Sequence, residues 1–260
     1  MADPTETAMT EAKKNIRIVV AYDGSRYHGW QRQPRALSIQ AVLEEAIHRI
    51  TREPSTLIAS GRTDAGVHAL HQVCHFFTRS SISPESIRRG LNSLTPEDIH
   101  IKEAGYAPLN FHAQYSARSK TYEYRILNRP DPDPFLRFYV WHIPVRLDLR
   151  EMERCLELIR GVNDFSAFRS SGGSPGDPIR NMIRAELHPP RGGIISLVFE
   201  ANGFLRHMVR NIVGTLVDAG KGRIDRKEFK RIMASRDRRQ AGIKAPPQGL
   251  YLKMVHYDVT

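Results

Sequence analysis

The sequence has few cysteines and no long apolar run, and both absences narrow what the protein can do. Its two cysteines, Cys74 and Cys155, are too few and too far apart for a thiolate metal site. A chain with only two thiols is expected to be a reduced, cytoplasmic protein. No apolar stretch approaches the roughly 20 residues that cross a bilayer, so we expect no membrane association.

Cofactor-binding loops are also missing. Gly220-Lys221 is similar to the end of a phosphate-binding loop, but Thr215 stands where the first glycine of that loop belongs. Gly222 replaces the Ser or Thr that would bind magnesium. There is no dinucleotide-binding glycine fingerprint either. The sequence therefore predicts no cofactor, and an enzyme of this kind would catalyse a reaction that is close to energetically neutral.

Charge gives the strongest compositional signal. The 39 Lys and Arg residues outnumber the 28 Asp and Glu residues, which leaves a net charge of +11. Such an excess favours a polyanionic partner such as nucleic acid, although solubility alone also explains a basic composition. The charges are not gathered on one amphipathic helix, which argues against a membrane surface.

Hydrophobic periodicity predicts an α+β fold of two similar halves around one or two antiparallel sheets. Residues 1–15 are polar and are expected to form a disordered leader, and the two halves to be domains at 16–117 and 118–260. The segment Ser170–Pro178 is expected to be a mobile loop with no assigned role. Strands are predicted at 16–22, 71–78, 99–104, 122–127, 179–187, 194–200 and 250–257, and helices at 39–50, 84–94, 149–159, 204–217 and after 225. Ser38, Ser83, Asp148 with Glu151, and Asp225 with Glu228 have the spacing of helix caps.

The most distinctive segment is the loop at residues 61–69, with the sequence GRTDAGVHA. Two glycines bracket Arg62 and Asp64, and glycine lets a loop approach a ligand closely. An aspartate in such a loop is ionised at neutral pH unless it is buried. Arg62 could orient that carboxylate, pair with phosphate or fill the space of an extruded base. An ordinary Asp turn with a solvated arginine is an equally good interpretation.

Three histidines close to Asp64 raise the alternative of a metal site. If residues 71–78 form a strand, His71 and His75 share one face, whereas His68 stays in the loop. This spacing favours structural histidines and no bound metal.

Aromatic and basic residues alternate in two segments, residues 22–35 and 115–125. Aromatic rings stack on unpaired bases while cations meet phosphate, so this pattern is typical of RNA-binding surfaces. Ordinary packing is the alternative for each single ring. Tyr122, Tyr124 and Ile126 share one strand face, so we expect at least one of the tyrosines to be buried.

Within the helix predicted at 204–217, Arg206 and Arg210 lie one turn apart on a common side. Two such arginines clamp a phosphate or pair with a carboxylate, and an exposed cationic face is the alternative. A buried arginine needs a partner, and Asp64 is the candidate. A further group of arginines is predicted to be a solvated patch that contacts phosphate: Arg236, Arg238 and Arg239.

Five segments in order resemble motifs of the TruA family of tRNA pseudouridine synthases. The GRTDAGVHA segment resembles the family's active-site motif, and KTYEY at 120–124 resembles its tyrosine strand. YDG at 22–24 with GWQ at 29–31 resembles its opening strand and loop. FLRHMVRN at 204–211 and APPQGLYL at 245–252 resemble its second-domain helix and its closing strand. The resemblance covers nearly the whole chain after the leader and implies the pseudouridine synthase fold.

The resemblance implies an isomerase, an intramolecular transferase, that needs no cofactor. The family cuts the bond between C1′ of the ribose and N1 of uracil, rotates the base and rejoins it through C5. Asp64 is implied as the nucleophile, whether it attacks the sugar, attacks the base or assists removal of a sugar proton. Tyr122 matches a tyrosine that packs on the uracil and helps to deprotonate C5. Arg210 matches an arginine that pairs with the aspartate, and Arg62 would replace the flipped nucleotide.

The resemblance also implies a substrate and an assembly. The targets would be uridines 38–40 in the anticodon arm of tRNA, where extruding a base from a flexible loop costs least. The assembly would be a homodimer in which one tRNA contacts both subunits. Two other functions are compatible with the same residues: a non-catalytic RNA-binding module, and a metal-dependent phosphoesterase that uses Asp64 and the histidines.

Overall fold

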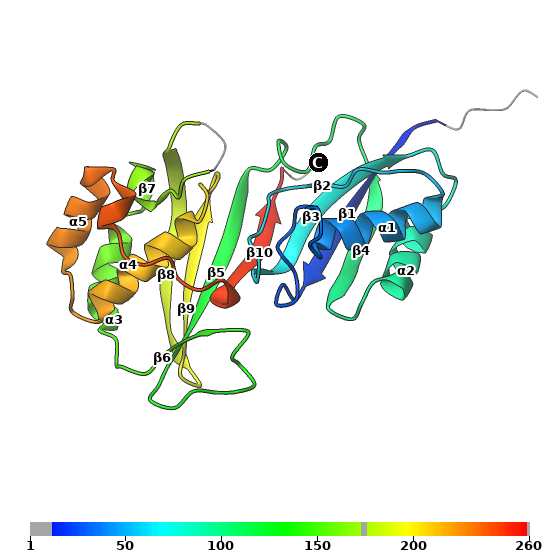
Figure 1. Ribbon diagram of the computed structural model, residues 1–260. Coiled ribbons are helices and arrows are strands. Elements are labelled where there is room, and N and C mark those ends of the chain that lie inside the picture. Colours follow the sequence, from blue (N-terminus) through cyan, green and yellow to red (C-terminus); the bar gives the residue numbers. More distant parts are fainter. Residues whose placement is uncertain (1–11, 173–175, 259–260) are drawn as a thin grey trace, which may run out of the picture.

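The computed structural model describes residues 12–172 and 176–258, and one mixed sheet runs through it (Figure 1). Of the predicted leader, residues 1–11 lie outside the described residues, whereas Lys14 and Asn15 already belong to the first strand. Residues 173–175 of the predicted loop at 170–178 also lie outside them. The strands are β1 (Lys14–Tyr22), β2 (Ile58–Ala59), β3 (His68–Thr78), β4 (Ile99–Ala107), β5 (Ser119–Asn128), β6 (Trp141–Ile143), β7 (Gly161–Asp164), β8 (Ile179–Arg191), β9 (Ile194–Ala201) and β10 (Leu250–His256).

The strand order repeats itself. Along the sheet the strands follow the order β4-β1-β3-β10-β5-β9-β8-β7, with β2 paired to β3 and β6 paired to β5. In the first half β1 lies between β4 and β3, and in the second half β5 lies between β10 and β9. Each half therefore places its first strand between its last strand and an inner strand, which confirms the predicted α+β fold of two similar halves.

The two halves meet where the last strand of the chain joins the first half. β10 runs parallel to β3, with Tyr251 opposite His68 and Leu252 opposite Ala69. β5 and β6 are also parallel, while the other strand pairs are antiparallel. The expected antiparallel sheet is therefore a mixed one. The predicted domain boundary near Ala117 falls in the connection between β4 and β5, and the division into two domains stays a prediction because one sheet spans both halves.

The helices form two groups at the two ends of the sheet (Figure 1). α1 and α2 lie at the end with β4, and α3, α4 and α5 lie at the end with β8, so that β5 and β10 run between the groups. The helices are α1 (Ile39–Thr51), α2 (Pro84–Leu94), α3 (Leu149–Glu157), α4 (Met208–Gly220) and α5 (Arg226–Ser235), with short 3₁₀ turns η1 (Ser166–Phe168), η2 (Arg238–Gln240) and η3 (Pro247–Gly249). No helix in the described part of the chain is long and apolar enough to cross a membrane.

The predicted helix caps are mostly confirmed. Ser38, Ser83 and Asp225 each accept a hydrogen bond from a backbone N–H in the first turn of α1, α2 and α5. Asp148 caps α3 in the same way, but the predicted capping box is wrong. Glu151 Oε1 accepts from the backbone N–H of Arg226 at the start of α5, so this side chain joins two helices instead of closing its own.

The predicted start of α4 is also wrong. The helix begins at Met208 rather than at residue 204, because His207 has a φ of +61° and interrupts the helical path. Arg206 therefore lies outside the helix, and the predicted pair of arginines one turn apart does not form. Arg206 donates to the Ser171 carbonyl at 2.8 Å, while Arg210 is buried within α4.

Candidate active site

Asp64 lies in the loop between β2 and β3, and the end of β1 and the residues after it pack behind that loop. The Tyr22 hydroxyl and Thr63 Oγ1 are 2.7 Å apart in a buried hydrogen bond, and the Trp30 N–H donates to the Thr63 carbonyl at 3.0 Å. Gly29 has a φ of +87°, and a Cβ there would lie 2.6 Å from the Thr63 carbonyl oxygen. Only glycine therefore permits this approach, and the loop is supported immediately beside its aspartate.

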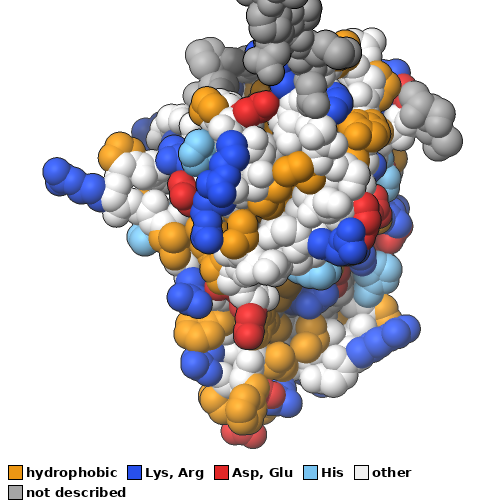
Figure 2. All heavy atoms as spheres, turned by 90° about the vertical axis from the view of Figure 1, so that its right-hand side faces the viewer, with side chains coloured by type: hydrophobic (Ala, Val, Ile, Leu, Met, Phe, Trp, Pro, Cys, Tyr) orange, Lys and Arg blue, Asp and Glu red, His pale blue; other side chains and the backbone are white. Residues whose placement is uncertain are grey.

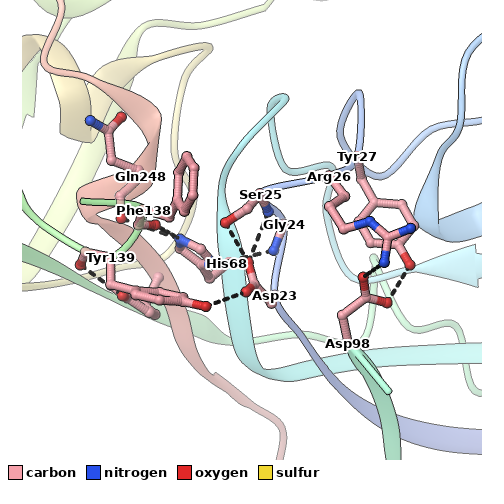
Figure 3. Close-up of polar contacts among 11 residues, drawn as sticks. Asp23, Gly24, Ser25, Arg26, Tyr27, His68, Asp98, Phe138, Tyr139 and Gln248 are labelled. Atoms are coloured by element: carbon pink, nitrogen blue, oxygen red, sulfur yellow. Dashed lines mark hydrogen bonds and ion pairs between the residues drawn. The ribbon is translucent and has the colours of Figure 1, made fainter. Parts of the chain in front are cut away.

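A second set of contacts starts at His68, the first residue of β3 (Figure 3). Its Nε2 lies 2.9 Å from the Phe138 carbonyl and 3.2 Å from the Gln248 carbonyl, while Nδ1 accepts from the Gly24 N–H at 3.1 Å. Because Nε2 faces two carbonyl acceptors, it carries a proton, while Nδ1 also lies 3.1 Å from Asp23 Oδ1. Burial lowers the pKa of His68, although the charge of Asp23 and the hydrogen bonds to the ring oppose this shift.

His68 thereby joins three segments that are far apart in the sequence. The Tyr139 hydroxyl donates to Asp23 Oδ2 at 2.7 Å (Figure 3), and the Tyr251 hydroxyl donates to the Tyr139 carbonyl at 2.8 Å. The His68 ring stacks on Tyr251 with the ring centroids 4.7 Å apart. The connection between β5 and β6 is thus fixed to both halves of the sheet, next to the end of the loop that carries Asp64.

The Asp64 carboxylate is paired with residues at the start of α4. Arg210 Nη1 lies 2.9 Å from Asp64 Oδ2, and His207 Nε2 lies 3.4 Å from the same oxygen. No hydrogen bond from a described residue reaches the other oxygen, Oδ1. The Asp64 side chain is 35% exposed, whereas that of Arg210 is 7% exposed. One carboxylate oxygen is therefore held by the protein and the other is available to a ligand.

The electrostatic environment created by His207 and Arg210 keeps Asp64 ionised. Burial by itself raises the pKa of the carboxyl, but hydrogen bonds from His207 and Arg210, and the electrostatic interactions of both with the carboxylate, hold that pKa below its ordinary value. The predicted pairing of Arg210 with Asp64 is confirmed as a contact. A carboxylate that stays charged and half open to solvent suits a nucleophile.

Arg210 is itself held from behind. Its Nε donates to the Ala245 carbonyl at 2.7 Å, and the Ala245 N–H donates to the Arg210 carbonyl at 3.1 Å. One turn further along α4, a Cβ at Gly214 would lie 1.7 Å from the Ile243 carbonyl oxygen. Glycine at position 214 lets residues 243–245 lie directly against the helix, and their carbonyl then orients the guanidinium.

His207 is the site residue that the sequence did not single out. It is a non-glycine residue with a positive φ at the N-cap position of α4, and its Nδ1 is buried without a hydrogen-bond partner among the described residues. A positive φ at a residue that contacts the carboxylate makes His207 a candidate functional residue. Periodicity could not reveal it, because His207 stands in a segment that reads as continuous helix.

Tyr122 lies on β5, and its ring packs against Phe204 edge to face, with the centroids 4.9 Å apart. Burial, together with the negative charge of Asp64, raises the pKa of its hydroxyl above the ordinary value. Tyr122 is therefore a neutral phenol close to the carboxylate. Both predicted tyrosines are buried, since Tyr124 is fully covered and donates to the Pro246 carbonyl at 2.7 Å.

Arg62 is exposed in the same loop as Asp64. No ion pair or side-chain hydrogen bond links it to any described residue, so it does not orient the carboxylate, and that predicted alternative is wrong. The structure thus brings Asp64, Arg210, His207 and Tyr122 together and leaves Arg62 free at the surface beside them.

Comparison with known proteins matches the sequence of the chain to one family. Residues 18–116 and 156–258 match the model of a family described as tRNA pseudouridine synthase. The tRNA pseudouridine synthase A of Thermoanaerobacter sp. (strain X514) is 46% identical over 244 residues, which cover 94% of this chain and all of that protein. Those of Acetivibrio thermocellus and Caldicellulosiruptor saccharolyticus are 42% and 43% identical over the same shares. The chain belongs to the TruA family of tRNA pseudouridine synthases.

The two segments that the family model matches contain different residues of the site. Asp64 lies in the first matched segment of this TruA-family chain, and His207 and Arg210 lie in the second. Tyr122 falls between the two segments, although the similarity to the synthase of Thermoanaerobacter extends over almost the whole chain. The carboxylate and its partners therefore come from the two regions that define the family.

Two of the three histidines near Asp64 in this family member bind backbone groups. His68 binds backbone groups as described above, and His75 Nδ1 accepts from the Ala113 N–H at 3.1 Å. His71 Nδ1 is buried without a hydrogen-bond partner among the described residues. Within residues 12–172 and 176–258, no group of three or more His, Cys, Asp and Glu side chains could hold a metal ion.

The structure bears on two of the predicted RNA-contact surfaces. Tyr22, Tyr27 and Trp30 are buried in the core, so packing is the correct interpretation of these rings. In the predicted solvated arginine patch, Arg236 and Arg239 are exposed and pair with Asp164 and Asp237, whereas Arg238 is half-buried and donates to Asn211. Contact of this patch with phosphate stays a prediction. Figure 2 shows the end of the TruA-type fold with α1 and α2, where basic side chains are spread among acidic and apolar ones.

Proposed function

We propose that the protein isomerises uridine to pseudouridine at positions 38–40 in the anticodon stem-loop of tRNA, with Asp64 as the nucleophile. The single observation that carries the proposal is the Asp64–Arg210 pair. It holds one oxygen of an ionised carboxylate at 2.9 Å and leaves the other free. Membership of the TruA family supports the reaction class.

The reaction conserves all atoms of the nucleotide. The bond between C1′ and N1 breaks, the base rotates, and a bond between C1′ and C5 forms. The proton on C5 leaves and N1 gains a proton, so neither an oxidant nor an energy source is consumed. Asp64 Oδ1 makes the nucleophilic contact with the target nucleotide, while Arg210 and His207 stabilise the carboxylate through Oδ2.

The side chains of Arg62 and Tyr122 accommodate the extruded base. Taking the uridine out of its stack costs a few kcal/mol, and Arg62, exposed beside Asp64, takes its place in the RNA. Tyr122, backed by Phe204, packs on the uracil, and its hydroxyl passes on the C5 proton. These roles rest on the position of each residue around the carboxylate.

The proposal includes the partner and the compartment. A net charge of +11 favours tRNA as the polyanion, and a homodimer would let one tRNA contact two subunits. Cys74 and Cys155 are both free and buried, which is compatible with the reducing conditions of the cytoplasm.

The test maps pseudouridine in tRNA incubated with the wild-type protein or with Asp64→Asn, in buffer that contains EDTA. We expect product at positions 38–40 with the wild type and none with Asp64→Asn, although the variant still binds tRNA. Glu153→Gln, an exposed carboxylate on α3, is the matched control and retains activity. Binding without product by the wild type would favour an RNA-binding module, and loss of activity on chelation would favour a metal-dependent phosphoesterase.

A further inference from the structure

Lys120 has no role in the reaction described above, yet it lies beside the loop that carries Asp64. It stands on β5, where alternate side chains point to the same side of the sheet. Lys120 and Tyr122 therefore share a face, and Glu123 lies on the opposite one. Lys120 thus lies on the same side of the sheet as Tyr122, whose pKa is raised in part by the charge of Asp64.

The ammonium group of Lys120 rests on the first residue of the active-site loop. A Cβ built on Gly61 would lie 3.3 Å from Lys120 Nζ and 3.7 Å from its Cε. Gly61 is fixed in turn, because its carbonyl accepts a hydrogen bond from Gln72 Nε2 at 2.8 Å. The lysine head group is therefore placed against a rigid backbone, within the same short loop as Asp64.

No group in the described part of the chain neutralises this ammonium. Its Nζ makes no hydrogen bond or ion pair with a described residue, whereas Lys253, also close to β5, pairs with Glu123 at 3.2 Å. Lys120 is nevertheless half-buried, and burial lowers its pKa below the ordinary value. Withdrawing a cation from water without an anionic partner is unfavourable, so the position is set up for an anion that arrives with a ligand.

We propose that Lys120 Nζ binds a backbone phosphate adjacent to the uridine that enters the site. The inference rests on the proposed function, because it assumes an RNA nucleotide at Asp64. An extruded nucleotide carries a phosphate on each side of its ribose, and a flexible ammonium with three donors binds phosphate as a compact point charge. Lys120 would thereby fix the ribose relative to the carboxylate, without contacting the base.

The experiment is a thermodynamic cycle between the lysine and the phosphate. Anticodon stem-loop RNAs carry a neutral methylphosphonate at the 5′ or the 3′ side of the target uridine, and their dissociation constants are measured for wild type and Lys120→Gln. For one of the two positions, we expect the methylphosphonate to weaken binding to the wild type by about tenfold to a hundredfold. The same methylphosphonate should cause little further loss with Lys120→Gln.

Two further variants sharpen the result. Lys120→Arg keeps the charge and should keep most of the sensitivity to the methylphosphonate. Lys230→Gln removes an exposed lysine on α5 and should respond to the neutral phosphate as the wild type does. Equal losses with wild type and Lys120→Gln at both positions would overturn the inference. Because the cycle reads binding, it remains decisive even if the wild type forms no pseudouridine, which would contradict only the proposed function.

Discussion

Asp64 and Arg210 are 146 residues apart in the sequence, yet Nη1 of the arginine lies 2.9 Å from Oδ2 of the aspartate. The contact joins a loop of the first half of the sheet to a helix of the second half. His207 approaches the same oxygen from the start of that helix. The pair thus depends on how the two halves meet, and the charge of the carboxylate depends on the pair.

His207→Asn should move the acid side of the pH–rate profile to higher pH. The pKa of Asp64 is held below its ordinary value, so removing the contribution of His207 lets it rise, and the carboxylate is then protonated at a higher pH. Asparagine tolerates the positive φ at this position, which limits backbone effects. The measurement is single-turnover pseudouridine formation as a function of pH.

His188→Asn is the control for that profile, since His188 lies on β8 beside Glu186 and should leave the acid limb unchanged. A profile for His207→Asn that coincides with the wild type would remove His207 from the electrostatics of the site.

Tyr122→Phe should retain tRNA binding and lose turnover by roughly a hundredfold, within the range typical of a missing acid–base group. The ring still packs against Phe204, but the hydroxyl that passes the C5 proton is gone. Binding is measured by titration and turnover with saturating tRNA. Wild-type turnover in this variant would show that the phenol has no part in proton transfer.

Arg62→Ala should lower kcat/KM by about tenfold to a hundredfold, because the vacated space in the RNA is no longer filled and the cost of extrusion rises. The defect should shrink on a substrate whose target uridine is already unstacked by a mismatch. Both substrates are compared under single-turnover conditions. An identical defect on the two substrates would mean that Arg62 acts at another step.

Gly29→Ala should destabilise the active-site loop by about 1–3 kcal/mol and reduce turnover. Its Cβ would meet the Thr63 carbonyl oxygen at 2.6 Å, and its φ is +87°. Gly105→Ala on β4 is the matched control, since no atom lies within 4 Å of the position of its Cβ. Thermal melting and turnover are measured for both. Equal melting temperatures for the two variants would contradict the close contact.

Local chemistry allowed the elements of the fold to be predicted where a side chain acts on its own neighbours. Ser38 and Ser83 cap the helices that follow them, as expected. The prediction of helix caps and strands failed where a residue far away in the sequence provides the hydrogen-bond partner. Glu151 binds the backbone of Arg226 in place of its own helix start, and β2 and β6 exist only because they pair with other strands.

The residues of the site also fall into those that the sequence predicted and those that it did not. Asp64 is recognisable in the sequence because two glycines flank it, and the expected partner Arg210 is correct. His207 escaped notice because a positive φ leaves no trace in a periodic apolar pattern. Lys120 escaped as well, since only the packing of β5 against Gly61 distinguishes it from an ordinary basic residue near a tyrosine.

The sequence alone determined the kind of elements, most of their limits, the basic charge and the loop with its aspartate. These follow from interactions between residues that are close in the chain, and from composition. Only the tertiary structure decided that β10 joins β3, which side chains reach Asp64 and which cations remain without a partner. Those outcomes depend on distances between segments that are remote in sequence, and such distances are set by the packing of the whole sheet.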